Sequence, residues 1–182
     1  MDDPELLAAA IGAGQNLGIA APLRRRNNLL AMAAAAGFAD QVAALLQAGA
    51  SVLARDRAWQ KDGPTALMLS ARGGHVEVVK MLMRSGADPM ECDCRGWSAL
   101  RFAANAGHAA VVRLLLDAGA TDSRSDKGWC STDGEAEWDA MRGNHWEAAA
   151  LLRDNRHARE RAAEQKAKAA ESEAKRGITG IG

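Results

Sequence analysis

The chain has 182 residues and a formal net charge of zero, with 23 lysines and arginines against 23 aspartates and glutamates. This balance excludes attraction of the chain as a whole to nucleic acid or to an anionic membrane surface. The sequence is rich in alanine, leucine and glycine, with two phenylalanines and no tyrosine. Side chains this small favour closely stacked short helices over a bulky core.

The cysteines and the N-terminus favour a cytoplasmic protein. Cys92, Cys94 and Cys130 are odd in number and show no paired framework, which is typical of a reducing compartment. The first residues, MDDPELLAAAIGAG, include acids where a secretory signal would have basic residues, and no apolar run approaches about 18 residues. We therefore expect a soluble protein with a cytoplasmic localisation.

Residues 1–23 are predicted to form a short helix, capped by an aspartate near its start, and a loop. The helix would end at Gly12. Gly12 precedes Gly49 by 37 positions, and Gly49 precedes Gly86 by the same interval. The segment is therefore a candidate degenerate capping repeat, of the kind that a repeat array needs at its end.

The centre of the chain repeats itself at an offset of 33 residues. The stretch from Gly63 to Asp88 reads GPTALMLSARGGHVEVVKMLMRSGAD, and the stretch from Gly96 to Thr121 reads GWSALRFAANAGHAAVVRLLLDAGAT. Self-similarity at this period is the signature of a repeat architecture. A chain of this length can build a continuous core from such repeats, although one repeat alone could not.

Each central copy predicts two antiparallel helices. Thr65 or Ser98 can cap the first helix, and Gly74 or Gly107 permits the positive φ that a reversal into the second helix needs. In the second helices, apolar residues recur at the three- and four-residue spacing of one buried face. These residues are Val78, Val79, Leu82 and Met83 in one copy and Val111, Val112, Leu115 and Leu116 in the other.

Two less regular copies flank the central pair. The first copy runs from Asn27 to Ala50 and is followed by about four extra residues between Asp56 and Gly63, which predicts a lengthened hairpin. The fourth has Asn144 in place of the turn glycine, because asparagine tolerates the left-handed region better than most residues. The predicted repeat boundaries are 24–60, 61–93, 94–126 and 127–157.

The segment 158–182 is predicted to form a charged helical tail with a disordered end. The chain from Arg153 to Arg176 is almost entirely Ala, Lys, Arg, Glu and Gln, which are strong helix formers. Alanines at heptad spacing mimic a coiled-coil seam, but alanine buries too little area to favour one. We therefore expect a solvated helix and a monomeric protein.

In this register each copy resembles the ankyrin repeat, whose pattern runs turn glycine, T-P-L-H-x-A, G-H, an apolar helix and a final G-A-D. The resemblance implies an all-α, right-handed solenoid of about four helix-turn-helix repeats with short hairpin loops. It also implies a structural role for His75 and His108, which directly follow the turn glycines. The family's binding groove is concave and is lined by the hairpin tips and the inner helices.

One departure from the family concerns the T-P-L-H box, which reads TALM, SALR and EAEW in the second to fourth copies. Met68, Arg101 and Trp138 thus replace the histidine that ordinarily ties neighbouring repeats together. We therefore expect the repeat interfaces to rely on apolar packing. Arg101 would then present its charge in the groove beside Arg95.

Tryptophans mark the predicted hairpins. Trp97 and Trp129 each follow a hairpin glycine, and Trp59 lies in the lengthened first hairpin. Each indole can either contact a partner, as tryptophan often does at interfaces, or cover a neighbouring hairpin. Trp146 aligns with a helix-start valine and is predicted to be in the core, whereas Trp138 fits either position.

The sequence offers little support for catalysis, and we expect no metal or cofactor. A tetrahedral zinc site needs about four ligands, and adjacent hairpins at the roughly 8–10 Å spacing of packed helices are too far apart for an easy disulfide. A thiol hydrolase using Cys130, Asp133 and His145 is a remote alternative, because nothing places the histidine within hydrogen-bond reach of the thiol.

The function predicted from the sequence is a non-catalytic protein–protein interaction module. Its partner is expected to be a protein, not nucleic acid or membrane. The candidate partner-binding residues are Trp97, Trp129, Arg95, Arg101, Arg72, Asn105 and Trp59. The alternative is a structural or scaffold subunit attached to a larger assembly or to the cytoskeleton through its charged C-terminal helix.

Overall fold

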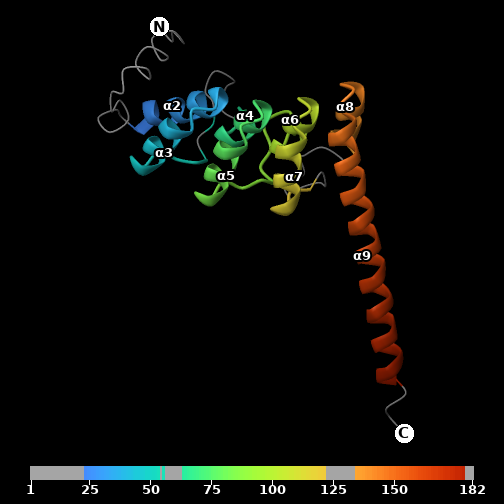
Figure 1. The fold of residues 1–182 in the computed structure, drawn as a ribbon. Coiled ribbons are helices and arrows are strands. Elements are labelled where there is room, and N and C mark those ends of the chain that lie inside the picture. Colours follow the sequence, from blue (N-terminus) through green and yellow to red (C-terminus); the bar gives the residue numbers. More distant parts are fainter. Residues whose placement is uncertain (1–22, 54, 56–62, 122–133, 179–182) are drawn as a thin grey trace.

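The computed structural model describes residues 23–53, 55, 63–121 and 134–178. The predicted N-terminal cap, most of the lengthened hairpin, Trp59, Trp129 and Cys130 therefore lie outside the described residues. The helices are α2 (Leu23–Ala36), α3 (Ala39–Gln47), α4 (Ala66–Arg72), α5 (Val76–Arg84), α6 (Ala99–Asn105), α7 (Ala109–Asp117), α8 (Glu135–Arg142) and α9 (Trp146–Ile178) (Figure 1).

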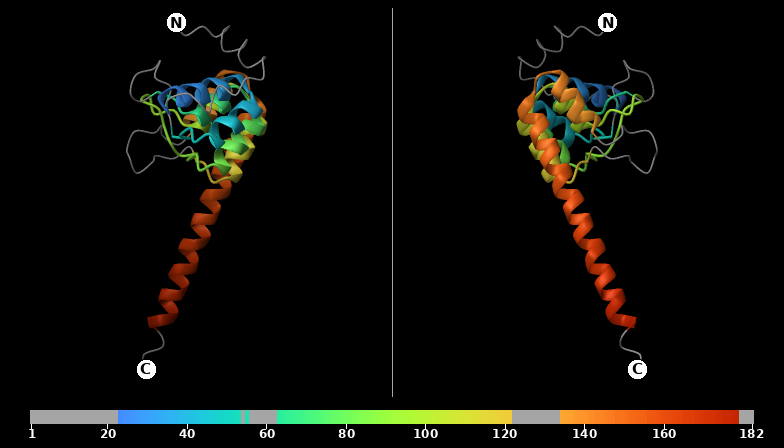
Figure 2. Two further views of the ribbon diagram at one scale, coloured as in Figure 1. Left: turned by 90° about the vertical axis from the view of Figure 1, so that its left-hand side faces the viewer. Right: turned by 90° about the vertical axis from the view of Figure 1, so that its right-hand side faces the viewer.

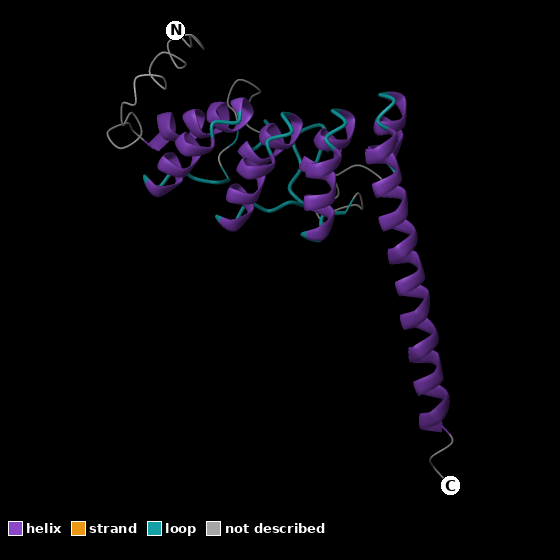
Figure 3. Ribbon diagram, in the orientation of Figure 1, coloured by secondary structure: helices purple, strands orange, loops and turns teal. Residues whose placement is uncertain are grey.

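The helices form two layers. The first helices of the pairs, α2, α4, α6 and α8, stack in chain order and make the first-helix layer. The second-helix layer consists of α3, α5, α7 and the start of α9, as the end-on views also show (Figure 2). Within the described residues, β-structure is confined to two isolated antiparallel bridges, Arg55 with Thr65 and Cys92 with Ser98 (Figure 3). The all-α solenoid predicted from the repeat is confirmed.

The predicted caps and turns are confirmed. Oγ1 of Thr65 accepts from the amide of Met68 at 3.4 Å, and Oγ of Ser98 accepts from the amide of Arg101 at 3.3 Å. Asn144 reverses the chain between α8 and α9 with φ 61°. It is the one non-glycine residue with positive φ in the part of the chain that the structure describes. The fourth copy therefore folds as a helix pair like the others.

We expect the Thr65→Ala variant to lose about 1 kcal/mol of unfolding free energy, because the amide of Met68 would lose its side-chain acceptor. Thr65→Ser keeps the hydroxyl and should lose less. Urea unfolding followed by circular dichroism measures both. Equal losses for the two variants would show that the methyl group of Thr65, which is buried, matters more than its oxygen.

The last helix pair replaces an apolar position of the preceding pairs with an ion pair. The buried leucines Leu30, Leu67 and Leu100 share a register position with Glu137 in α8. Nε of Arg153 lies 2.8 Å from Oε1 of Glu137, and Nη2 of Arg156 lies 2.9 Å from Oε2. Both arginines come from α9. This exchange gives the last pair a polar character, which the end of a repeat stack needs.

The core position predicted for Trp146 is wrong, because its side chain is 61% exposed. Trp138, at the register position of buried Met68, is 57% exposed. Both lie in the last helix pair, against which no further described pair stacks. Met68 is buried because the next helix pair packs over it, and no described helix pair packs over Trp138 or Trp146.

The charged tail is helical, as predicted, and it continues the second helix of the last pair without a break. α9 runs for 33 residues and projects away from the array (Figure 1). Its side chains from residue 157 to residue 171 are all exposed. The helix reaches Ile178 and so includes three residues of the end expected to be disordered, while residues 179–182 lie outside the described part.

Candidate protein-binding surface

The hairpin before α6 is built around a buried carboxylate. The side chain of Asp93 is 1% exposed, and its Oδ1 accepts from the amides of Arg95 and Trp97, each at 2.9 Å. Its Oδ2 pairs with Nη2 of Arg95 at 2.9 Å. Asp93 thus fixes both the backbone of the hairpin and the guanidinium of Arg95, and so orients Trp97.

Trp97 is partly buried and does not project freely from the hairpin. Its ring lies 5.2 Å from that of Phe102, and the guanidinium carbons of Arg95 and Arg101 lie 5.1 and 4.5 Å from its centroid. Of the two roles open to this indole, the contacts support that of a cover over its own repeat. They leave part of the ring and 42% of the Arg95 side chain accessible.

Arg101 corrects two expectations. Its side chain is 13% exposed, and its Nε lies 2.6 Å from Oδ2 of Asp139. Nη1 of Arg101 also pairs with Oε2 of Glu135. Its charge is therefore neutralised at the boundary between α6 and α8 and is not presented beside Arg95. This interface combines apolar packing with ion pairs, because α8 places carboxylates opposite the arginine.

Arg72 and Asn105 are exposed and occupy equivalent positions at the ends of α4 and α6. The next equivalent position, at the end of α8, is Arg142, which is also exposed. Sequence reasoning missed Arg142, although the offsets of 37 from Asn105 and 70 from Arg72 would have found it. Together these three residues define the helix-end row.

The histidines that follow the turn glycines bind the preceding repeat, as the resemblance implied. Nε2 of His75 lies 3.0 Å from the carbonyl oxygen of Ala35, and Nε2 of His108 lies 3.0 Å from that of Arg72. His145 also lies against the turn glycine of the preceding repeat, since a Cβ at Gly107 would collide with its Nδ1. These rings hold the stack together.

Cys92 corrects the expectation that no bridge forms. It is disulfide-bonded, whereas Cys94 is free and exposed. The argument for a reducing compartment from unpaired cysteines loses its support.

Little in the described residues suggests a catalytic centre. No group of three or more His, Cys, Asp or Glu residues there is placed to hold a metal ion. Of the thiol hydrolase residues, Cys130 and Asp133 lie outside the described part, and His145 packs on glycines.

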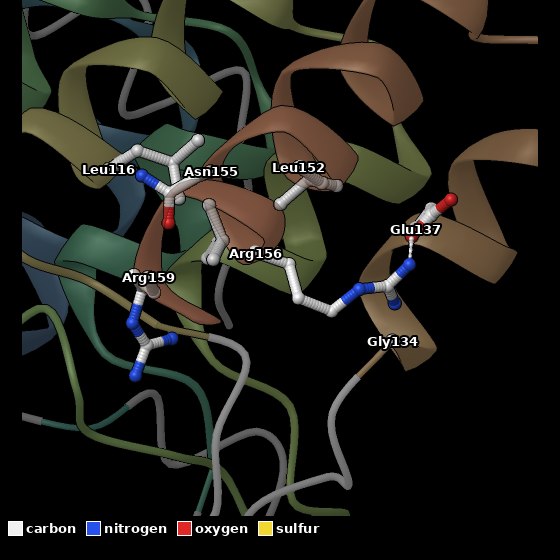
Figure 4. A pocket seen from close by; sticks show the side chains of 8 residues that line it. Leu116, Gly134, Glu137, Leu152, Asn155, Arg156 and Arg159 are labelled. Atoms are coloured by element: carbon white, nitrogen blue, oxygen red, sulfur yellow. Dashed lines mark ion pairs between the residues drawn. The ribbon is translucent and has the colours of Figure 1, made fainter. Parts of the chain in front are cut away.

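A pocket between the last two helix pairs has a volume of about 30 Å³, room for one or two waters. Figure 4 shows Arg156 reaching across it to Glu137. The lining residues are Leu100, Leu116, Gly134, Glu137, Leu152, Asn155, Arg156 and Arg159. A pocket of this volume does not hold a substrate-sized molecule.

Comparison with known proteins decides the family. The family model for ankyrin repeats, in three copies, matches residues 29–126, more than half of the chain. The chain belongs to the ankyrin-repeat family. Ankyrin repeats generally mediate protein–protein interactions and are typically non-catalytic. No curated protein matches the chain, and none of its described helices is long and apolar enough to span a membrane.

Proposed function

We propose that this ankyrin-repeat protein is a non-catalytic binding module whose concave side, formed by the first-helix layer and the hairpins, binds a protein partner. The observation that supports it most is the helix-end row. Arg72, Asn105 and Arg142 are exposed at equivalent positions of three successive repeats. None of these side chains is needed for the stacking contacts, which involve the backbone of Arg72 and the histidine rings.

The surface around Trp97 extends this binding face towards the hairpins. Arg95 and Trp97 are held by Asp93 and by each other, so little side-chain entropy is lost when a partner contacts them. Arg101 would contribute indirectly, because its guanidinium contacts the indole of Trp97 and helps to hold it in place. Trp129 and Trp59 remain candidates from the sequence.

A steric block tests the proposal. Asn105→Trp should abolish capture of the partner by the tagged full-length chain from a lysate, because an indole at the centre of the row would obstruct the surface. Arg113→Trp is the matched control, since Arg113 is an exposed helical residue in α7 of the other layer. Mass spectrometry identifies the proteins captured by both variants. Retention of every specific protein by Asn105→Trp would contradict this binding face.

A second candidate function is a scaffold subunit attached through α9. The supporting observation is the length of helix that leaves the array, with residues 157–171 exposed. Removing residues 160–182 tests it while keeping Arg153 and Arg156, which bind Glu137 and belong to the folded array. Loss of the captured proteins on this truncation, with an unchanged melting temperature, would favour attachment through the helix.

A further inference from the structure

The charges of the first-helix layer do not cancel at its surface. Its described side chains include three carboxylates, and each has an arginine partner. Arg101 pairs with Glu135 and Asp139, and Arg153 and Arg156 of α9 pair with Glu137. Among the described residues, the guanidiniums of Arg72 and Arg142 form no ion pair. The free charge of this layer is therefore positive, although the whole chain is neutral.

The second-helix layer differs, because it has charges of both signs. On α5, Nζ of Lys80 lies 2.8 Å from Oε1 of Glu77. This hydrogen bond and the charge of Lys80 lower the pKa of Glu77. Asp40 and Asp117 add negative charge on α3 and α7, and Arg113 adds positive charge. A negatively charged partner is therefore favoured at the first-helix layer.

Arg142 is already ordered for binding. Its guanidinium carbon lies 4.6 Å from the centroid of Trp138, and both side chains are exposed. The N–H groups of a guanidinium that lies over an indole point outward in the guanidinium's own plane, where they can donate to a carboxylate. The indole also offers apolar area beside the charge, as interface hot spots often do.

The spacing of the row suggests an extended ligand. Adjacent packed helices lie about 8–10 Å apart, so Arg72 and Arg142, two repeats apart, are separated by about 16–20 Å. An extended chain advances about 3.3 Å per residue and covers this distance in about five or six residues. The amide of Asn105, midway, can hydrogen-bond to the peptide backbone between them.

We propose that the helix-end row binds an extended acidic peptide segment of the partner, with carboxylates about six residues apart at Arg72 and Arg142. This inference rests on the proposed function and names the chemistry of the partner. Nucleic acid is less favoured, because the two arginines of the helix-end row neutralise few phosphates and nucleic-acid affinity grows with the number neutralised.

The test uses a fluorescein-labelled peptide with two pairs of glutamates centred six residues apart and glycine and serine between them. Fluorescence anisotropy measures its Kd for the full-length chain. Arg72→Gln and Arg142→Gln should each raise the Kd about fivefold, the upper range for an exposed ion pair. The double variant should raise it about 25-fold, because distant sites are additive. Salt should weaken the binding.

Three controls make the result specific. Arg113→Gln removes the same charge from the other layer and should leave the Kd within about twofold, since no contact is lost. Arg72→Lys keeps the charge and should retain most of the affinity. The peptide with glutamines should not bind measurably. Equal effects of Arg113→Gln and Arg72→Gln, or equal binding of the glutamine peptide, would overturn the proposal.

Two further results separate the ligand class from the binding face. If the peptide fails to bind while Asn105→Trp still abolishes partner capture, the acidic class is wrong and the proposed function stands. If Asn105→Trp has no effect on capture, the face itself is wrong. Binding of a ten-nucleotide single-stranded RNA more tightly than the peptide, with loss in the double variant, would overturn the acidic-peptide proposal in favour of nucleic acid.

Discussion

Gly74→Ala should destabilise the array by about 2–5 kcal/mol. Gly74 has φ 74°, and an alanine in the left-handed region costs about 1–2 kcal/mol. Its Cβ would also lie 2.6 Å from Nδ1 of His108, and overpacking of this kind adds about 1–3 kcal/mol. The methyl group would force the ring from its place between the second and third repeats.

Gly86→Ala is the matched control, because Gly86 has φ 92° but nothing within 4 Å of a new Cβ. Gly86→Ala should lower the free energy of unfolding by only about 1–2 kcal/mol, the cost of placing an alanine in the left-handed backbone region. Urea unfolding gives both free energies. Adding His108→Ala to Gly74→Ala and to wild type completes a double-mutant cycle, and the glycine substitution should be less costly when the ring is absent. Equal losses in Gly74→Ala and Gly86→Ala would show that the ring moves aside without cost.

Arg101→Met should destabilise the protein by about 3 kcal/mol, because it leaves the buried carboxylate of Asp139 without its cation. The figure is at the lower end for a broken buried pair, since the Glu135 side chain is 40% exposed and keeps access to water. Methionine is the residue at the same position of the preceding repeat, Met68, where it is fully buried. A methionine side chain therefore fits the space at this interface, but it has no positive charge to pair with Asp139.

Lys80→Met is the control for Arg101→Met. It breaks the exposed pair with Glu77 on α5, and exposed pairs contribute little to stability. Neutralising the partners in Arg101→Met with Glu135→Gln and Asp139→Asn should recover part of the loss. Urea unfolding measures all of these variants. A loss below about 1 kcal/mol for Arg101→Met would mean that water or other donors compensate the carboxylates at this interface.

The repeat of the sequence was sufficient to predict the scaffold. The offset of 33 residues locates the helix pairs, and the sequence also predicts the capping residues Thr65 and Ser98 and the turn residue Asn144. These features could be predicted because caps and turns depend on backbone conformation and on residues a few positions away. The role of His75 and His108 came from the family pattern alone, since their partners lie 40 and 36 residues away.

The candidate site was harder to predict. The sequence predicts Arg101 in the groove, but its guanidinium pairs with Glu135 and Asp139 of α8. Arg142 is not among the residues predicted for the site. Trp97 was expected at a hairpin tip, but it lies partly over Phe102. For Arg101 and Trp97 the outcome depends on residues that another repeat, or another element of the same repeat, brings within contact distance.

The sequence by itself determined the family, the helix pairs, their caps and the charged terminal helix. Only the tertiary structure showed which of the described first-helix arginines form ion pairs. A sequence pattern assigns each residue to a position in its own repeat, but the partner of a charge is chosen across the boundary between repeats. Arg72, Arg101 and Arg142 are all arginines on first helices, and only the one that faces the carboxylates of α8 is neutralised.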